Sequence, residues 1–179
     1  MKAEQSGGKA AIITGGGTGV GRATAIELAK CGHAIAVVYS RSKDEADQTV
    51  ADIRAAGFKA LAIRADVSVD ADCRAMVAAT LEAFGRVDVL INCAGATSFI
   101  PFDDLELVTD EVWERLFRVN VMGAFHCARA VQAAMIQDGG GIIINVSSVA
   151  ARLGQGSSIP YCASKAALDT LTVSLARTL

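Results

Sequence analysis

The sequence predicts an α/β fold in which helices cover both faces of a doubly wound, parallel sheet. Two observations lead to this prediction. Short apolar or β-branched runs alternate with longer amphipathic stretches along the whole chain, as in repeated strand–helix–strand units. The apolar runs are nearly continuous and do not alternate with polar residues, which is typical of strands buried on both faces. Right-handed crossovers then give a three-layer αβα sandwich with the strand order 3-2-1-4-5.

Each predicted element follows from a local pattern. The predicted strands are residues 10–14, 34–39, 59–65, 87–92 and 141–146. The predicted helices occupy residues 21–32, 44–57, 70–85, 110–137 and 160–179. Three helical stretches end in a glycine, at Gly32, Gly57 and Gly85, which suits the left-handed residue that stops a helix. Ser157 and Ser158 are hydroxyl caps for the last helix.

Composition narrows the class of protein. With 179 residues, 52% of them hydrophobic, the chain has the size and apolar content of one globular domain, residues 1–179. The net charge is −2 and basic residues are scattered, so we expect neither a nucleic-acid partner nor binding to an anionic membrane. The N-terminal stretch "MKAEQSGGKAAIITGGG" is neither a signal peptide nor a membrane span, and no later stretch is apolar over the length that a bilayer needs.

The five cysteines form no C-x-x-C pair, which indicates free thiols in a reducing cytoplasm. The two histidines, His33 and His126, have no companion ligands at metal-site spacing, so we expect no metal.

A glycine-rich loop, "TGGGTGVG" (14–21), lies between the first predicted strand and the first helix. The pattern G-x-G-x-x-G is not in register here, but T-G-x-x-x-G-x-G is, with Gly15, Gly19 and Gly21. Glycines allow a tight turn and a close backbone approach, and the helix N-terminus offers N–H groups to a pyrophosphate. The alternative is a flexible turn without a ligand. The place of the glycine-rich loop in the first βαβ unit favours a Rossmann-type dinucleotide site.

The end of the second predicted strand indicates which dinucleotide would bind. A NAD site usually has a carboxylate about 20 residues after the loop, which binds the ribose hydroxyls. This chain has Tyr39, Ser40, Arg41 and Ser42 there, and its next carboxylates lie inside the following helix. An arginine with two hydroxyls suits a 2′-phosphate. We predict NADP, with NAD as the alternative; an arginine that is only solvated is the competing interpretation.

The last two predicted strands and the helix after them carry further polar residues. In a parallel sheet, ligands bind beyond the carboxyl ends of the strands, where the strand order reverses. "INCAGA" (91–96) ends the fourth strand, and "INVSSVAA" (144–151) ends the fifth. Ser148 precedes Tyr161 by thirteen residues, and Lys165 follows Tyr161 by four, so the phenol and the ammonium share one helix face.

In this order the motifs resemble those of the short-chain dehydrogenase/reductase family. They are the glycine loop, "ADV" (65–67), N-x-A-G (92–95), the asparagine of "RVNVMG" (118–123), the serine, and Y-x-x-x-K. The resemblance covers essentially the whole chain and is nearest to 3-oxoacyl-[acyl-carrier-protein] reductases and glucose 1-dehydrogenases. It implies reduction of a carbonyl or oxidation of an alcohol with NAD(P), through four catalytic residues: Asn120, Ser148, Tyr161 and Lys165.

The resemblance assigns the proton-transfer role to Tyr161, and the chemistry agrees. A free tyrosine has a pKa near 10, and a value near 7 requires about 4 kcal/mol of stabilisation of the phenolate. An ammonium about 4 Å away contributes roughly that much at an effective dielectric near 20. Lys165 can therefore make Tyr161 an acid and base near neutral pH. In the family this lysine also holds the nicotinamide ribose.

The other assignments have plainer alternatives. By resemblance, Ser148 would polarise the substrate oxygen, Asn120 would hold a water behind Lys165, and Asp66 would bond the adenine amino group. Each could instead be structural. Ser148 could cap the strand end, Asn120 could be a buried polar group of its helix, and Asp66 could be a helix N-cap. Together, the glycine, arginine and family arguments assign the cofactor to Gly15, Thr18, Gly19, Val20, Gly21, Ser40, Arg41, Asp66, Val67, Asn92, Ala94, Gly95, Tyr161 and Lys165.

The chain departs from the family pattern in two places, at Cys93 and after the helix of Tyr161. Cys93 stands where N-N-A-G has its second asparagine, and we expect little effect. Cys162 is a candidate reactive thiol, with a passive small residue as the alternative. Family members usually continue beyond the helix of Tyr161 into further strands and a substrate lid. We therefore interpret the fold as C-terminally truncated, ending inside that helix, and do not expect normal turnover from these residues alone.

These observations predict an NADPH-dependent, cytoplasmic oxidoreductase for a small ketone, aldehyde or alcohol. The alternative is an idle NAD(P)-binding module or an inactive fragment of such an enzyme. By resemblance, helices 110–137 and 160–179 would pair between subunits of a homo-oligomer, a dimer or tetramer. The sequence does not identify the substrate or the direction of the reaction in the cell.

Overall fold

The structure is a computed structural model that describes residues 8–179. Residues 1–7 lie outside this range. They belong to the N-terminal stretch that we expect not to be a signal peptide. Among residues 8–179, five parallel strands form one sheet in the order β3-β2-β1-β4-β5, as predicted. The strands are β1 (Ala10–Thr14), β2 (Ala34–Tyr39), β3 (Ala60–Arg64), β4 (Val89–Asn92) and β5 (Ile142–Asn145). The last three are one or two residues shorter at their ends than expected.

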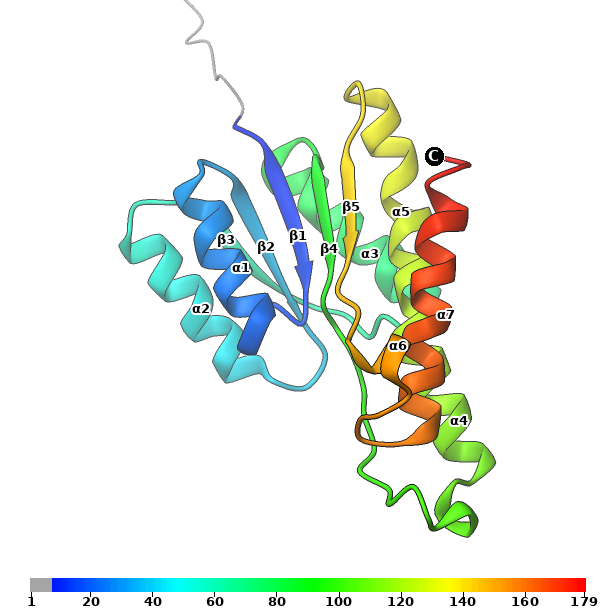
Figure 1. Ribbon diagram of the computed structural model, residues 1–179. Coiled ribbons are helices and arrows are strands. Elements are labelled where there is room, and N and C mark those ends of the chain that lie inside the picture. The colour runs from blue at the N-terminus through cyan, green and yellow to red at the C-terminus, as the bar shows by residue number, and fades with distance from the viewer. Residues whose placement is uncertain (1–7) are drawn as a thin grey trace, which may run out of the picture.

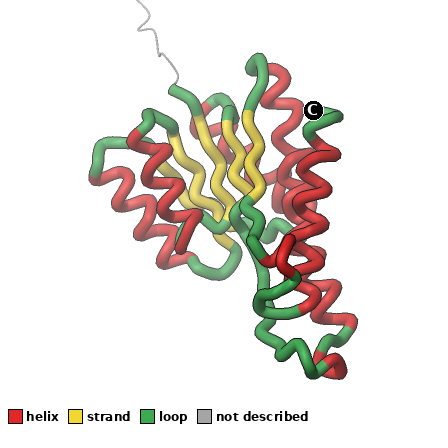
Figure 2. The backbone as a smooth tube through the Cα atoms, viewed as in Figure 1, coloured by secondary structure: helices red, strands yellow, loops and turns green. Residues whose placement is uncertain are grey.

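Helices lie on both sides of this single layer of strands (Figures 1 and 2). The α-helices are α1 (Gly19–Lys30), α2 (Lys43–Ala55), α3 (Asp70–Phe84), α4 (Asp110–Phe117), α5 (Gly123–Gln137), α6 (Ala150–Leu153) and α7 (Ile159–Leu175). A 3₁₀ turn, η1 (Leu105–Leu107), precedes α4, and a π-helical segment, η2 (Arg118–Met122), joins α4 to α5. Among these helices, none combines the length and the hydrophobicity needed to cross a bilayer.

The strands alternate their side chains between two cores. On one face, Ile12 packs with side chains of α3 and α5, among them Met76 and Val131. On the other face, Ala11 and Ile13 pack with α1 and α2. All five residues of β1 are buried, which explains its continuous apolar sequence. The prediction that helices cover both faces is therefore confirmed for the central strands.

The prediction that helices cover both faces of the sheet is wrong for β5. Ile142 and Ile144 are 59% and 48% exposed, whereas Ile143 between them packs against the core of α3 and α5. Because side chains alternate along a strand, the two exposed isoleucines point to the face of α1 and α2. Those helices pack over β1, β2 and β3 and leave this face of β5 open to solvent.

Two predicted helices also differ from the structure. The stretch 110–137 is helical throughout but is not a single α-helix, because the wider turn η2 separates α4 from α5. This turn contains the buried Asn120. Such π-turns are rare and are frequently found at functional sites. The last helix ends at Leu175, and Thr178 N–H then donates to the Leu175 carbonyl in a tighter turn. The three glycine stops are confirmed, with φ of 88°, 87° and 79° at Gly32, Gly57 and Gly85.

The amino-terminal end of the central strands, opposite the glycine loop, contains a partly buried ion pair between Arg86 and Asp88. Asp88, just before β4, is 7% exposed and accepts a hydrogen bond from the Ala10 N–H at 2.8 Å. Arg86 donates to both oxygens of the same carboxylate, at 2.8 and 2.6 Å. The Arg86 hydrogen bonds hold the pKa of Asp88 below its usual value, although burial acts in the opposite direction. Asp88 therefore ties the start of β1 to the start of β4.

We expect Asp88→Asn to lower the free energy of unfolding by about 1–3 kcal/mol at pH 7, because it removes a charge-assisted pair. A carboxylate whose pKa is depressed by folding stabilises the protein above its unfolded pKa and loses that contribution as the pH falls. The variant should therefore lose less stability between pH 5 and pH 3 than the unmodified chain. Urea unfolding at several pH values measures both effects.

Asp103→Asn is the matched control, because Asp103 is exposed and makes no ion pair among the described residues. Equal unfolding free energies for Asp88→Asn and Asp103→Asn at pH 7 would contradict the structural role of Asp88.

Candidate active site

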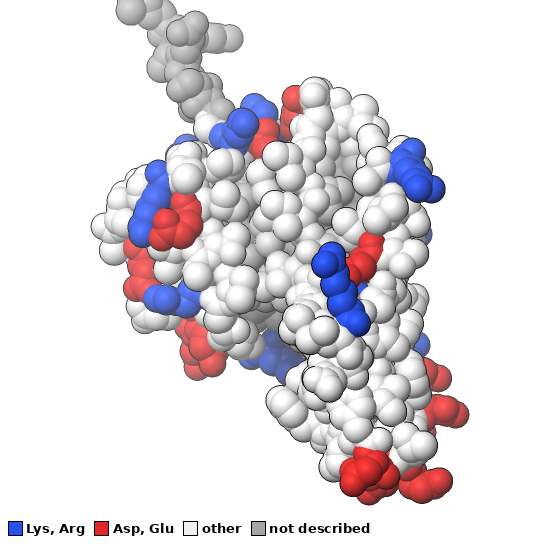
Figure 3. Space-filling model, in the orientation of Figure 1, with Lys and Arg blue, Asp and Glu red and all other residues white. Residues whose placement is uncertain are grey.

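A cleft of about 1090 Å³ lies at the carboxyl ends of the strands. Its walls come from the loops after β1, β2, β3, β4 and β5 and from the start of α7. The order of strands reverses between β1 and β4, so the cleft has the position at which doubly wound sheets bind ligands. In Figure 3, basic side chains lie deep in the recess below the sheet, and acidic residues gather at the far tip of the molecule. The arginines that line the cleft are Arg41, Arg64 and Arg115.

The glycine loop forms one wall of the cleft. Gly15 and Gly19 have positive φ, 66° and 50°, which side chains adopt only with strain. Gly21 lies beneath Gly15, and a Cβ atom on Gly21 would be only 2.2 Å from the Gly15 carbonyl oxygen. The helix α1 starts at Gly19, and the side chain of its N-cap, Thr18, makes no capping hydrogen bond. Backbone N–H groups of the first turn therefore remain available for an anion.

The next wall consists of the ends of β2 and β3. Ser40 and Arg41 line it, as predicted, together with Asp66. The Ser68 hydroxyl and N–H donate to the Asp66 carboxylate at 2.7 and 2.9 Å. The Ser68 hydroxyl is the main reason that the pKa of Asp66 is lowered, and the positive charge of Arg41 contributes in the same direction.

Sequence reasoning missed Arg64 as a member of this wall. Arg64 is the last residue of β3 and pairs in register with Tyr39 of β2. A strand-end position next to β2 is the signal that would have identified it.

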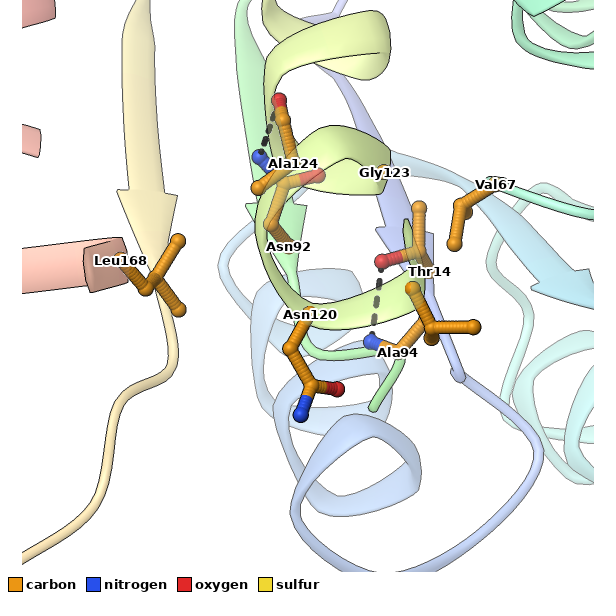
Figure 4. A pocket seen from close by; sticks show the side chains of 9 residues that line it. Thr14, Val67, Asn92, Ala94, Asn120, Gly123, Ala124 and Leu168 are labelled. Atoms are coloured by element: carbon orange, nitrogen blue, oxygen red, sulfur yellow. Dashed lines mark hydrogen bonds between the residues drawn. The ribbon is translucent and has the colours of Figure 1, made fainter. Parts of the chain in front are cut away.

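Thr14 is a buried residue that joins the two central strands, β1 and β4, at their carboxyl ends. Its hydroxyl accepts hydrogen bonds from the N–H groups of Cys93 and Ala94, at 3.1 and 3.0 Å. It donates to the Ile91 carbonyl at 3.3 Å. Figure 4 shows the bond to Ala94. Thr14 was part of the glycine motif in the sequence, but only the structure shows that it clamps β1 to β4.

Asn92 lies behind the cleft and does not line it. It is 5% exposed, and its amide nitrogen donates to Asn145 Oδ1 at 2.8 Å and to the Ala124 carbonyl at 3.4 Å (Figure 4). Its Oδ1 accepts no hydrogen bond from residues 8–179. The side chain thus connects β4 to β5 and α5.

Tyr161 and Lys165 line the opposite wall, on the first two turns of α7. Ser158 caps this helix by accepting a hydrogen bond from the Tyr161 N–H at 3.4 Å, and Pro160 lies in the first turn. Lys165 is 6% exposed, and its Nζ lies 5.9 Å from the centre of the Tyr161 ring. Lys165 donates to the Val146 carbonyl at 2.9 Å. Burial lowers the pKa of Lys165, and the nearby Cys93 and Asp169 partly offset this effect.

The two serines after β5 have different positions. Ser147 lines the cleft, and its hydroxyl lies 3.5 Å from the Lys165 carbonyl oxygen. Ser148 is not part of the lining, and its hydroxyl accepts a hydrogen bond at 3.1 Å from the N–H of Ala150, the first residue of α6. The substrate contact that resemblance assigns to Ser148 therefore stays a prediction.

Asn120 is buried in η2, next to the cleft but not on its surface. Its Oδ1 accepts from the Ala96 N–H at 2.7 Å, and its Nδ2 donates to the Ala96 carbonyl at 3.0 Å. The second Nδ2 hydrogen goes to the Ser164 hydroxyl at 2.9 Å. Both amide donors are used within the chain, so this side chain has no free donor for the water that resemblance assigns to it.

The predicted cofactor residues fall into two groups, those that line the cleft and those that lie beneath it. Those that line the cleft are Gly15, Thr18, Gly19, Val20, Ser40, Arg41, Asp66, Val67, Ala94, Gly95, Tyr161 and Lys165. Gly21 and Asn92 lie beneath it. The two thiols that we singled out also differ, since Cys93 lines the cleft whereas Cys162 is buried in α7. Burial raises the pKa of Cys93.

Comparison with known proteins gives consistent matches over the whole described chain. Residues 9–179 match the family described as short chain dehydrogenase. The chain is 43% identical over 172 residues to an uncharacterized oxidoreductase of Methylorubrum extorquens, covering 96% of this chain and 67% of that protein. It is 36% identical over 172 residues to the 3-oxoacyl-[acyl-carrier-protein] reductase FabG of Staphylococcus epidermidis, covering 96% and 69%.

Solved structures agree with the sequence matches. A crystal structure of a short chain dehydrogenase/reductase from Burkholderia phymatum in complex with NAD superimposes with a TM-score of 0.89 at 38% identity. The match covers 96% of this chain and 60% of that one. The chain spans about two thirds of the length of the curated relatives that it matches, from 66% to 69%.

Proposed function

The chain belongs to the short-chain dehydrogenase/reductase family, and from this premise we propose that it is an NADPH-dependent oxidoreductase that interconverts a ketone or aldehyde and an alcohol. The observation that carries the proposal is the pairing of Tyr161 and Lys165 on one face of α7, across the cleft from the glycine loop. A phenol beside a buried ammonium is a proton donor and acceptor for a carbonyl oxygen.

The cleft has the features that a dinucleotide requires. Gly19 has a positive φ and open space around it, so the loop leaves room for a phosphate directly over the first turn of α1. Gly15 lies close against Ala94, which brings the two walls together where a pyrophosphate would cross the sheet. Arg41, which follows β2, and Lys165 on α7 both line the cleft, so a dinucleotide would place its adenosine near Arg41 and its nicotinamide near Lys165. A nicotinamide held beside Lys165 would supply the hydride for reduction.

The chain's own residues would handle the proton. Tyr161 would donate its phenolic proton to the substrate oxygen during reduction and accept one during oxidation. Lys165, held by the Val146 carbonyl, would stabilise the phenolate by its positive charge. Ser148 would hydrogen-bond the substrate oxygen and orient it. Asn120 would act through the backbone of Ala96 and through Ser164, because its amide is bonded to both.

Incubation of the chain with NADPH and a β-ketoester such as ethyl acetoacetate tests the proposal. Loss of absorbance at 340 nm that requires both components would support it. Saturable binding of NADPH without turnover of any ketone or aldehyde would instead favour an idle cofactor-binding module.

We infer that NADPH is preferred to NADH. Arg41 and Arg64 stand at the ends of β2 and β3, where the adenosine ribose would lie, and Ser40 adds a hydroxyl. A 2′-phosphate would gain charge-assisted hydrogen bonds from these groups. The relative from Burkholderia phymatum was crystallised with NAD, so membership of the family does not by itself select NADP, and the preference for NADPH rests on these local side chains.

We expect Arg41→Ala to weaken NADPH binding about tenfold and to leave NADH binding within about twofold, because only the phosphate loses a partner. Titration of nicotinamide fluorescence with both nucleotides measures this. Arg177→Ala is the control, since Arg177 is exposed and does not line the cleft. If the unmodified chain binds NADH and NADPH equally well, the preference assigned to Arg41 is wrong.

The surface of the helices supports a homo-oligomer, a dimer or tetramer. Met122 and Phe125, at the junction of η2 and α5, are 49% and 38% exposed, and Val173 on α7 is 56% exposed. Large apolar side chains exposed on neighbouring helices are typical of surfaces that pack against another subunit.

A further inference from the structure

Ser164 occupies the position on α7 between the two residues of the proposed acid–base pair. Its side chain is completely buried, in contrast to the partly exposed Tyr161 three residues earlier. The Ser164 hydroxyl accepts a hydrogen bond from Asn120 Nδ2 at 2.9 Å and donates to the Tyr161 carbonyl at 2.8 Å. Both hydrogen-bonding functions of this hydroxyl are therefore used, one within α7 and one toward η2.

The partner of Ser164 is itself fixed to the cleft. Asn120 bonds both backbone groups of Ala96, and Ala96 lines the cleft beside Gly95. A Cβ atom on Gly95 would lie 3.4 Å from Asn120 Oδ1 and 3.8 Å from Lys165 Nζ. The amide of Asn120 and the ammonium of Lys165 therefore lie on the same side of Gly95, within a few ångströms of the cleft floor.

Polar bonds of this kind determine how α7 sits against the sheet. Lys165 bonds the Val146 carbonyl after β5, and farther along α7 the Thr172 hydroxyl accepts from Asn145 Nδ2 at 2.8 Å. Of these bridges, only the one through Ser164 connects the first turns of α7 to η2 and, through Asn120, to the wall of the cleft. Serine stabilises a helix interior less than alanine does, so its presence here is explained by the bond across to Asn120.

We propose that Ser164 is a positioning residue of the active site: by joining Asn120 to the first turn of α7, it sets the distance between Lys165 and Tyr161. This inference rests on the proposed function, in which Tyr161 transfers a proton. Without the hydroxyl, one buried amide hydrogen of Asn120 has no acceptor, and α7 or Asn120 shifts to give it one. The Lys165 ammonium is held by the Val146 carbonyl outside α7, whereas the Tyr161 ring moves with the helix, so a shift of α7 changes the distance between the ammonium and the phenol.

The ionisation of Tyr161 is a direct readout that does not need turnover. The chain has two tyrosines, so in a Tyr39→Phe background the phenolate absorbance at 295 nm reports Tyr161 alone. An increase of about 1 Å in the ammonium–phenolate distance raises the midpoint of this titration by about half a pH unit. We expect Ser164→Ala to give this shift, together with a tenfold or larger fall in kcat and little change in the affinity for NADPH.

Two variants on α7 provide the comparison. Ser174→Ala removes an exposed hydroxyl that bonds the Thr170 carbonyl at 3.0 Å within the same helix, and it should leave the midpoint unchanged. Ser164→Cys keeps a weak acceptor for Asn120 and a weak donor for the Tyr161 carbonyl. It should therefore fold even if Ser164→Ala does not, and it should show a smaller shift in the same direction.

A Lys165→Met variant separates this inference from the proposed function. If Lys165→Met leaves the phenolate midpoint unchanged, the acid–base pairing itself is wrong. If Lys165→Met raises the midpoint but Ser164→Ala and Ser164→Cys do not, only the positioning role of Ser164 is overturned. A shift in Ser174→Ala equal to that in Ser164→Ala would overturn it as well.

Discussion

Replacement of Tyr161 by phenylalanine should lower the rate of carbonyl reduction about 10²- to 10⁴-fold, the usual contribution of a positioned general acid. The substitution removes one oxygen from a side chain at the cleft wall and leaves the ring in place. The Ser158 cap bonds the backbone N–H of residue 161 and not its side chain, so the start of α7 should be unaffected. The loss should therefore appear in kcat.

The measurement is the initial rate of NADPH oxidation with a saturating β-ketoester, for the unmodified chain and for Tyr161→Phe. A fluorescence titration with NADPH should give dissociation constants within about threefold of each other, which shows that the cleft is intact. Retention of more than a tenth of the rate by Tyr161→Phe would refute its role as general acid.

The second large effect is expected from Gly21→Ala. The new Cβ would lie 2.2 Å from the Gly15 carbonyl oxygen and would push the loop away from α1. Overpacking of this kind typically costs about 1–3 kcal/mol of stability. The displaced loop is also the wall that would hold the pyrophosphate, so we expect NADPH affinity to fall at least about tenfold.

Gly85→Ala is the matched control for stability. Gly85 ends α3 with φ of 79° and open space around its Cβ position, so alanine there introduces backbone strain of about 1 kcal/mol without touching the cleft. Both variants should unfold at lower urea concentrations, but only Gly21→Ala should lose cofactor affinity. Normal NADPH binding by a folded Gly21→Ala chain would contradict the proposed function of the glycine loop.

Most of the fold could be predicted from the sequence because its signals are local. The continuous apolar run of residues 10–14 is explained by burial on both faces, and the glycine stops follow from backbone conformations that only glycine adopts without strain. The order of strands follows from the right-handed crossover of each βαβ unit. The same reasoning failed at β5, because whether a helix covers Ile142 and Ile144 depends on elements remote in the sequence.

The site shows the same division. The glycine loop and the i,i+4 pair of Tyr161 and Lys165 could be identified from spacing alone, since a helix and a strand–helix turn fix the relative positions of residues within a few positions. Their approach across one cleft also follows from the strand order, because the ends of parallel strands meet at one edge of the sheet.

What only the tertiary structure decided are the contacts between side chains from different elements. The Thr14 hydroxyl joins β1 to β4 through hydrogen bonds from Cys93 and Ala94. Arg64 lines the same part of the cleft as Arg41. The amide nitrogen of Asn120 donates its two hydrogens to Ala96 and Ser164. The hydrogen bonds among these contacts require polar atoms from segments far apart in the sequence to lie about 3 Å apart, within a few tenths of an ångström. Sequence patterns determine which residues share a face or a strand end, whereas the packing of those elements determines which polar groups meet, and therefore which remain free for a ligand.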